Sequence, residues 1–288
     1  MKVDNAIILS AGTSSRFAPI SYEIPKALIE VRGEILIERQ IKQIKESGIN
    51  EIIVVTGYKP EKFEYLSEKY GVTLIHNPDY LTRNNNSSIF YAKDYLKNSY
   101  ICSSDNYFLY NPFENEVDES YYSCVFVKGK TDEWCVNEKN GIIKSVVIGS
   151  ENSWVMLGHV FWDKNFSKKF LSILEQEYEK PETTDKLWET IYLEHIDKLK
   201  MKIRKYPKDY IFEFDTLDEL RAFDSSYIEN SRSDILKKCA KFLNTEEKNI
   251  KNITAIKDTD NIAVGFRFSY DKEYIYYYKT GKPEEIKI

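Results

Sequence analysis

The chain has 288 residues, enough for one large domain or as many as two ordinary ones. Its net charge of −5 excludes a nonspecific nucleic-acid binder, because such proteins need a basic surface to neutralise phosphates. Aliphatic and aromatic residues are plentiful, with 22 tyrosines and 15 phenylalanines, so we expect a globular protein in which any phosphate site is local.

Cysteine spacing and apolar runs bear on where the protein works. Its four cysteines form no C-x-x-C pair, and the chain begins without the charged and apolar regions of a secretory signal. No apolar run approaches the roughly 20 residues that span a bilayer. We therefore expect a cytoplasmic protein with reduced thiols, no zinc site and no membrane insertion.

Residues 6–28, AIILSAGTSSRFAPISYEIPKAL, are the most informative stretch. A buried strand at Ala6–Leu9 precedes a loop of small residues at Ser10–Ser15, and Arg16 and Lys26 follow. Small residues let backbone N–H groups approach a phosphate, and the two cations supply the charge that a polyphosphate needs. The alternative is a turn that only reverses the chain. The stretch is neither a Walker loop nor a dinucleotide fingerprint.

Strands and helices alternate after this loop. Helical spacing places Ile37, Ile41 and Ile44 on one face of a helix. The expected elements are a short strand at 27–31, a helix at 35–47, a strand at 51–56, a helix at 59–69 and a strand at 72–76. This order predicts an α/β fold with a doubly wound, mostly parallel mixed sheet, which binds ligands at the carboxyl ends of its strands.

Residues 77–88, NPDYLTRNNNSS, form a polar loop with three consecutive asparagines. The loop is either a plain surface turn, which asparagine favours, or a binding segment. In the second case Asn84, Asn85 and Ser88 present amide and hydroxyl groups to a base or to an acceptor. We expect a helix at 89–97 after it.

The strand expected at 99–103 should lie in the middle of the sheet, and Ser104, Asp105 and Asn106 follow it directly. A carboxylate at the carboxyl end of a central strand is well placed to hold a hard cation such as Mg²⁺. A cap of a turn or helix is the alternative role of Asp105.

From residue 121 the pattern changes to strands expected at 121–129, 141–149 and 154–163, with a helix at 165–179. Trp134 follows two acidic residues, and Trp188 precedes Glu189. A tryptophan beside a carboxylate suits an organic cation, which needs a π face and a counter-charge. Packing in the core is the alternative role for each tryptophan.

A strand expected at 210–216 ends in a second carboxylate, Asp215, which by itself is typical of the N-cap of the helix expected at 217–223. A linker-like segment at 225–233 precedes a small α+β unit at 234–288. Its expected elements are a helix at 234–242 and strands at 249–256, 262–270 and 274–278. Such a fragment seldom folds alone, so it should dock on the main domain or on a partner, including a second copy in a homodimer.

The segments LSAG, SSR and PKAL together resemble the signature of nucleotidyltransferases that make nucleotide-activated sugars and alcohols, L-A-A-G-x-G-S/T-R followed by P-K. Ser14 replaces the second glycine of that signature. The resemblance covers about residues 3–224 and extends to bacterial CTP:phosphocholine cytidylyltransferases. It implies a Rossmann-like, GT-A-like domain at 1–224, with a nucleotide-binding half at 1–110 and an acceptor-binding half at 111–224. The unit at 234–288 faintly resembles the first strands of choline kinases, and we expect it to pack or dimerise, not to transfer phosphate.

This resemblance also implies the roles of individual residues. Arg16 and Lys26 match the catalytic cations, and Asp105 and Asp215 match the two ligands of Mg²⁺. Acceptor binding falls to Trp134, Trp188 and Glu189, which resemble the tryptophan-acid segments of the family. Nucleotide binding falls to Leu9, Ala11, Gly12, Thr13, Ser14, Ser15, Asn84, Asn85 and Ser88.

The resemblance thus implies a Mg²⁺-dependent enzyme that moves CMP from CTP to a phosphorylated small amine such as phosphocholine. Alternative acceptors are 2-aminoethylphosphonate, a phosphorylated amino-acid amide and a sugar 1-phosphate. A nucleotide-binding regulatory subunit is the non-enzymatic alternative. The acceptor phosphate is already an anion and needs no general base, so we expect His76, His159 and His195 to be structural or exposed.

Overall fold

The computed structural model describes residues 1–259 and 262–286 of the chain. Contacts between residues divide the chain into two compact units, each built from two segments. Unit 1 consists of Met1–Gly12 and Ile37–Glu213, and unit 2 of Thr13–Leu36 and Phe214–Ile288. The segment after the first strand therefore shares a unit with the C-terminal part of the chain. The division of the chain at residue 224 stays a prediction.

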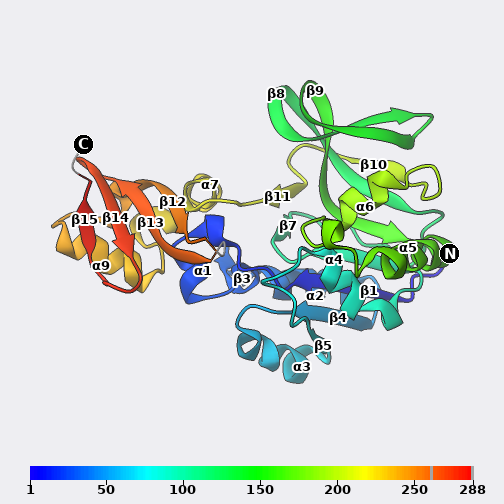
Figure 1. Cartoon of the computed structure of the whole chain (residues 1–288), viewed down its shortest axis with the longest axis horizontal. Coiled ribbons are helices and arrows are strands. Elements are labelled where there is room, and N and C mark those ends of the chain that lie inside the picture. The colour runs from blue at the N-terminus through cyan, green and yellow to red at the C-terminus, as the bar shows by residue number, and fades with distance from the viewer. Residues whose placement is uncertain (260–261, 287–288) are drawn as a thin grey trace. The chain divides into compact units, whose positions relative to one another are not determined.

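A seven-stranded mixed sheet forms the centre of unit 1 (Figure 1). Neighbours in the run β6-β1-β4-β5 are parallel, β9 is antiparallel to β6 and β8, and β10 pairs in parallel with β8. The strands, in order across the sheet, are β10 (Lys202–Tyr206), β8 (Tyr121–Lys139), β9 (Ile142–Trp162), β6 (Ser99–Ser103), β1 (Asn5–Ser10), β4 (Glu51–Thr56) and β5 (Thr73–His76). The predicted mixed sheet, with the strand at 99–103 inside it, is confirmed.

The parallel strands are apolar because both of their faces are covered. Within β1 the run AIIL, and within β4 the run IIVV, are almost wholly buried, as expected for central strands of such a sheet. Helices and 3₁₀ turns make the crossovers and later connections. In unit 1 they are α2 (Leu36–Glu46), η3 (Pro60–Phe63), α3 (Glu64–Tyr70), α4 (Asn86–Tyr91), η4 (Lys93–Tyr95), α5 (Lys164–Glu177), η5 (Pro181–Thr183) and α6 (Trp188–Glu194).

Aromatic packing fixes α5 and α6 to the sheet. The ring of Trp162, at the end of β9, lies 4.6 Å from the ring of Phe170 on α5 and 5.1 Å from that of Trp188 on α6. All three rings are buried in the core of unit 1. The first residue of α6 is therefore anchored, which sets the position of the polar residues that follow it.

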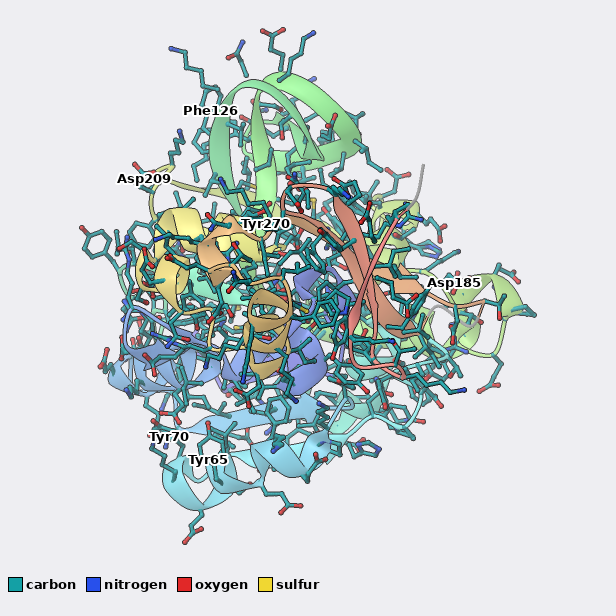
Figure 2. The ribbon with its side chains drawn as sticks, turned by 90° about the vertical axis from the view of Figure 1, so that its left-hand side faces the viewer. Tyr65, Tyr70, Phe126, Asp185, Asp209 and Tyr270 are labelled. Carbon is teal, nitrogen blue, oxygen red and sulfur yellow. The ribbon has the colours of Figure 1, made fainter. Side chains whose placement is uncertain are left out.

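Two strands, β8 and β9, occupy the region for which the sequence predicts three. They continue as a two-stranded arm beyond the sheet, and Phe126 marks the start of this arm (Figures 1 and 2). Register shifts interrupt the pairing of β8 and β9 at several points, and residues with positive φ, among them Gly129, Gly149 and Asn152, lie along the two strands. Residues 150–152 of β9 are polar and exposed, so the sequence indicates a turn where the strand continues.

Other differences have local causes. The predicted strand at 27–31 is wrong for its first residues, because the N–H of Leu28 bonds to the carbonyl of Pro25 and forms a 3₁₀ turn. The predicted strand at 210–216 is only β11 (Ile211–Glu213), which pairs with β7 (Asn106–Phe108) in a separate two-stranded sheet. The charged sequence KIRKY of β10 gives no apolar signal, and the sequence analysis missed it.

Unit 2 combines short turns after Gly12 with C-terminal helices and an antiparallel sheet. Its early elements are η1 (Ser15–Phe17), α1 (Ile20–Glu23), η2 (Lys26–Leu28), β2 (Glu30–Val31) and β3 (Glu34–Ile35). Its later elements are α7 (Leu217–Phe223), α8 (Ser226–Glu229), α9 (Asp234–Phe242), η6 (Glu247–Asn249), β12 (Lys251–Lys257), β13 (Ala263–Ser269), β14 (Glu273–Tyr277) and β15 (Pro283–Glu285).

The small sheet has the order β12-β13-β14-β15 and lies beside α9 (Figure 1). The predicted helix at 234–242 and the hairpin at Asp271-Lys272 are confirmed, and β15 was missed. Residues 260–261 and 287–288 of the predicted C-terminal unit lie outside the described residues. The segment predicted as a linker is folded instead, since it contains α8 and buries Tyr227 and Ser231. Within the described part of the chain, no helix has the length and apolar character that crossing a membrane requires.

Gly57, directly after β4, is required by the close approach of two neighbouring segments. A Cβ atom at this position would lie 2.6 Å from the Cβ atom of Tyr80 and 2.8 Å from the carbonyl oxygen of Ala11. Neither distance is compatible with van der Waals contact. The missing side chain therefore lets the loops after β1 and β4 meet.

We predict that Gly57→Ala lowers the free energy of unfolding by about 1–3 kcal/mol, because the backbone must shift to admit the methyl group. Urea denaturation of the purified chain measures the change. Gly12→Ala is the matched control, since an added Cβ there meets no described atom within 4 Å. Equal stability of the two variants would contradict the prediction.

Candidate active site

Backbone hydrogen bonds hold the loop that follows β1. The carbonyl of Leu9 accepts a bond from the N–H of Ser104 (3.2 Å), and that of Ala11 accepts one from the N–H of Tyr58 (3.0 Å). The segments after β1, β4 and β6 thus meet at the carboxyl edge of the parallel strands, where such sheets bind ligands. The backbone of Gly12 borders open space, because a Cβ there would touch nothing described within 4 Å.

Ser14 adopts the conformation for which glycine is suited. Its φ of 48° and ψ of 42° are left-handed, and its carbonyl accepts a bond from the N–H of Phe17 at 2.9 Å. Thr13, Ser14 and Ser15 are all partly exposed. Ser14 therefore holds a conformation that glycine adopts more readily, at a cost of about 1 kcal/mol.

Arg16 and Lys26, both in unit 2, share one carboxylate. The Nη1 atom of Arg16 lies 2.6 Å from Oδ2 of Asp215, and Nζ of Lys26 lies 3.7 Å from Oδ1. The side chain of Arg16 is 73% exposed, whereas that of Lys26 is 4% exposed. The structure thus brings together three residues that the sequence analysis had placed in the catalytic machinery. Lys26 is buried beside its counter-charge, and Arg16 reaches solvent.

The start of α7 holds Asp215 in place. Thr216, not Asp215, is the N-cap of this helix, and it forms a capping box with Glu219. Glu219 also accepts a bond from the backbone N–H of Asp215 at 2.6 Å. The carboxylate of Asp215 is therefore left to the two cations and does not serve as the cap.

Asp105 lies in the turn between β6 and β7, within unit 1. Its Oδ1 atom accepts a bond from the hydroxyl of Ser103 at 2.6 Å. The side-chain amide of Gln40, on α2, donates to the carbonyls of Ser103 and Asn106, both at 2.8 Å. These two bonds hold the backbone on either side of the turn. The Oδ1 atom of Asn106 is buried and has no hydrogen-bond partner among the described residues.

The asparagine loop is bound to the segment that leads into α6. The side chain of Asn84 donates to the carbonyl of Asp185 at 3.1 Å, and Asp185 is labelled in Figure 2. Asn85 accepts a bond from the N–H of Trp188 (2.7 Å) and donates to Oε2 of Glu189 (3.1 Å). Two segments that are about a hundred residues apart, and that the sequence analysis singled out separately, therefore meet through Asn85.

Ser88 lies inside the molecule, because α4 begins at Asn86, three residues before the predicted start at 89. The Oγ atom of Ser88 accepts a bond from the side-chain amide of Asn77 at 3.1 Å, and both residues are buried. This contact gives Ser88 a structural role within unit 1. Its predicted contact with the nucleotide stays a prediction.

Glu189 is the most strongly perturbed carboxylate of the site. Burial raises its pKa to about 7, although hydrogen bonds from the side chains of Asn85 and Tyr122 lower it in part. The Tyr122 hydroxyl lies 3.4 Å from Oε1 of Glu189. A carboxylate that is held in this way ionises with difficulty by itself and gains from a nearby cation.

The two predicted acceptor tryptophans differ in their surroundings. Trp188 is 3% exposed, stacks on Tyr122 with ring centroids 5.8 Å apart, and belongs to the core of unit 1. Trp134 is partly exposed on the β8–β9 arm, where it pairs with Ile148. Burial gives Trp188 a packing role, and substrate contact by either ring stays a prediction.

The histidines and cysteines have structural surroundings. His159 is buried between the hydroxyls of Tyr121 and Ser123, and burial lowers its pKa to about 3, so it is neutral at physiological pH. The Nε2 atom of His195 lies 2.9 Å from a carboxylate oxygen of Glu177, and His76 ends β5 on the surface. All four cysteines are free and buried.

Candidate metal ligands are few. Over residues 1–259 and 262–286 no group of three or more His, Cys, Asp or Glu side chains is placed to hold a metal ion. Magnesium is commonly held by one or two carboxylates together with substrate phosphates, so it does not need such a group. The carboxylate oxygens of Asp105 are hard donors of this kind. The following residue in the sequence, Asn106, carries a buried Oδ1 atom without a partner among the described residues.

Several residues that build the site were not found from the sequence. Gln40 and Gly57 position the turns after β6 and β4, Tyr122 contacts Glu189, and Glu219 holds Asp215. A glutamine beside the apolar face of α2, and a glycine directly after a buried strand, were available signals. For Glu219 the signal was the T-x-x-E pattern of a capping box at Thr216–Glu219. For Tyr122 no local signal exists, because its partner Glu189 is distant in the sequence.

Comparisons with known proteins show which family the chain resembles. Residues 6–109 match the family described as the MobA-like NTP transferase domain. The chain is 35% identical to the choline-phosphate cytidylyltransferase of Streptococcus pneumoniae, over 76% of this chain and 96% of that protein. It is 32% identical to the 2-aminoethylphosphonate cytidylyltransferase of Lancefieldella rimae, over 80% of this chain and 95% of that protein.

Among solved structures, the CTP:phosphocholine cytidylyltransferase from Streptococcus pneumoniae matches with a TM-score of 0.75 and 34% identity, over 78% of this chain and 99% of that one. The fold is therefore that of a nucleotidyltransferase, and the chain is an enzyme of this class. It belongs to the cytidylyltransferase family that includes the bacterial choline-phosphate cytidylyltransferases. The resemblance inferred from the opening motif is confirmed.

The raised pKa of Glu189 predicts a pH-dependent gain in stability for Glu189→Gln. The free carboxyl ionises near pH 4.3, so ionisation of Glu189 costs the folded state stability as the pH rises from about 4.3 to about 7. The variant should be more stable than the wild type by about 1–3 kcal/mol at pH 8 and nearly equal to it at pH 4.5.

Urea denaturation at the two pH values measures this difference. Glu182→Gln is the control, because Glu182 is exposed and water solvates its charge in both states. A difference between Glu189→Gln and the wild type that is the same at pH 4.5 and pH 8 would contradict the burial of this carboxylate.

Relief of the left-handed conformation predicts that Ser14→Gly stabilises the chain. The gain should be about 0.5–1 kcal/mol, because the freedom of glycine in the unfolded chain offsets part of it. Thermal unfolding of the variant and the wild type measures the effect. If the variant unfolds at a lower temperature, residue 14 does not adopt the left-handed conformation in solution.

Proposed function

We propose that this enzyme transfers CMP from CTP to a phosphorylated small amino alcohol, with phosphocholine as the favoured acceptor, and releases pyrophosphate in a Mg²⁺-dependent reaction. The observation that carries the proposal is the contact of Asn85 with Glu189 and Trp188, which joins the asparagine segment expected to bind the nucleotide to the tryptophan-acid segment expected to bind the acceptor. The names of the relatives in Streptococcus pneumoniae and Lancefieldella rimae support a cytidine nucleotide and an amine-bearing acceptor.

In the proposed reaction an oxygen of the acceptor phosphate attacks the α-phosphorus of CTP. A new P–O bond forms, the bond from the α-phosphorus to the bridging oxygen breaks, and pyrophosphate leaves with that oxygen. The backbone of residues 9–15 binds the nucleotide, where Gly12 leaves room for close approach. Positioning and neutralisation of charge are the main contributions of a protein to such a step.

Arg16 and Lys26 take different parts in this proposal. Lys26 is buried beside Asp215 and offsets the repulsion between the α-phosphate and the incoming phosphate. Exposed Arg16 binds the β and γ phosphates. It can exchange the carboxylate of Asp215 for them, because an exposed ion pair contributes at most about 1 kcal/mol. This exchange releases Oδ2 of Asp215.

Asp105 and Asp215 are the proposed ligands of Mg²⁺. The hydrogen bond from Ser103 orients Asp105, and the capping box of α7 orients Asp215. When bound, the metal ion would neutralise charge on the nucleotide phosphates. Within the chain itself, Gln40 and Glu219 support the ligands by fixing the backbone on which they lie.

Glu189 is the proposed counter-charge for the amine of the acceptor. Burial raises its pKa to about 7, so the ionised form is destabilised in the free protein. A bound cation would stabilise the ionised form and offset the cost of burying the charge. Asn85 and Tyr122 keep the carboxylate in one orientation. The similarity to the Lancefieldella rimae enzyme favours 2-aminoethylphosphonate as the second candidate acceptor.

Pyrophosphate release with each of the four common nucleoside triphosphates tests the proposal. The acceptor panel contains phosphocholine, 2-aminoethylphosphonate, phosphoglutamine and glucose 1-phosphate. We expect turnover with CTP and phosphocholine, at a rate above that of any other pair. Turnover confined to a sugar phosphate, or an absence of turnover with every CTP pair, would contradict the proposal.

Lys26→Met should lower kcat/KM by at least about a hundredfold, because it removes a fixed charge beside the reacting phosphates. Methionine keeps the volume of the buried side chain, so thermal unfolding should still show a folded protein. Lys62→Met, at an exposed position on η3, is the matched control and should keep wild-type activity. Equal activities of the two variants would remove Lys26 from the mechanism.

A further inference from the structure

The residues between Arg16 and Lys26 form little regular structure of their own. The helix α1 (Ile20–Glu23), which lies between the two cations in the sequence, is a single turn. A helix needs about 12–15 residues before it is even marginally stable by itself in water. The path of the chain from one cation to the other must therefore depend on residues that pack against α1. Tyr278 and Ile235, which contact the end of this helix, belong to unit 2, as α1 itself does.

An aromatic stack joins α1 to the C-terminal sheet. The rings of Tyr22 and Tyr278 are nearly parallel, at 10°, with centroids 3.6 Å apart. Tyr278 directly follows β14, and its backbone N–H bonds to the carbonyl of Val264 on β13 at 3.0 Å. The sheet thus carries the ring on which Tyr22 lies.

A carboxylate joins α1 to α9. The Oε1 atom of Glu23 accepts a bond from the backbone N–H of Ile235 at 2.8 Å. The Oγ atom of Ser233, the N-cap of α9, accepts a bond from the N–H of Leu236 at 3.0 Å. Because the first turn of a helix carries partial positive charge, the anionic side chain of Glu23 is well placed there. Both residues at the end of α1 are therefore held by elements from the C-terminal part of the chain.

The chain is also held on the far side of Lys26. The carbonyl of Glu30 accepts a bond from Nη1 of Arg232 at 3.1 Å, and the N–H of Arg32 donates to Oδ2 of Asp224 at 2.7 Å. The hydroxyl of Tyr227, on α8, donates to the same carbonyl of Glu30. Contacts from residues beyond 223 thus flank Lys26 on both sides in the sequence.

We propose that the C-terminal elements α8, α9 and β12–β15 position Arg16 and Lys26 for phosphate binding, and that Tyr22 and Glu23 are the positioning residues through which they act. This inference rests on the proposed function for its kinetic consequence, but its structural part can be measured without turnover. The C-terminal sheet thus supports the transferase reaction and does not carry an activity of its own.

Hydrogen exchange of backbone amides in residues 14–28 tests the structural part. In Tyr22→Ala we expect these amides to exchange at least tenfold faster than in the wild type, because the stack no longer holds α1. Tyr22 is 44% exposed, so its removal leaves the buried core of unit 2 intact. Tyr270→Ala is the matched control, since it removes a similarly exposed tyrosine, 40% exposed, from the turn between β13 and β14 in the same unit. Tyr22→Phe keeps the stacked ring and should restore slow exchange.

Steady-state kinetics test the functional part. We expect Tyr22→Ala to lower kcat/KM for CTP at least tenfold while KM for the acceptor changes less than twofold, with recovery in Tyr22→Phe. Glu23→Ala, which removes the acceptor for Ile235, should act in the same direction. Exchange and kinetics of Tyr22→Ala that match those of Tyr270→Ala would overturn the inference. If the wild type shows no turnover with any CTP pair, the proposed function fails, and the exchange experiment still decides whether the C-terminal elements hold residues 14–28.

Discussion

Burial of the Lys26 ammonium beside Asp215 is the constraint on which the arrangement of cations in unit 2 depends. A buried charge without a partner is costly, so Lys26 fixes where Asp215 must lie. Asp215 in turn is held by Glu219 at the start of α7, and it also contacts Arg16. The same carboxylate therefore contacts one buried cation and one exposed cation, which suits a site that must be preformed yet must release part of its charge to a substrate.

In unit 1, too, packing and hydrogen bonds position a charged side chain, the carboxylate of Glu189. Aromatic packing of Trp188 with Trp162 anchors the first residue of α6, and the next residue, Glu189, is thereby held in surroundings that raise its pKa. Asn85 then bonds to both residues and ties the asparagine loop to the same helix. Apolar packing places the carboxylate, and hydrogen bonds orient it. Trp188 thus contributes through its position in the core, whether or not its ring reaches a ligand.

Sequence reasoning was most accurate where a local signal repeats. The apolar runs of β1 and β4, the helical spacing of α2 and the hairpin between β13 and β14 are all local patterns, and the structure agrees with them closely. It failed along the β8–β9 arm, because the exposed polar residues 150–152 lie inside β9 where their composition indicates a turn. It also placed Ser88 in a loop, since buried serine and asparagine that bond to each other, as at Asn77, look like surface residues in a sequence.

The sequence by itself determined the family, the mixed sheet and the identity of the charged residues, because a motif and its spacing are written in consecutive positions. Only the tertiary structure decided which of these residues meet. It paired Asp215 with Arg16 and Lys26, and it joined Asn85 to Glu189. It also grouped the segment after Gly12 with the C-terminal elements. Such contacts depend on how distant segments pack, and burial and electrostatic pairing between them leave no mark on the local order of residues.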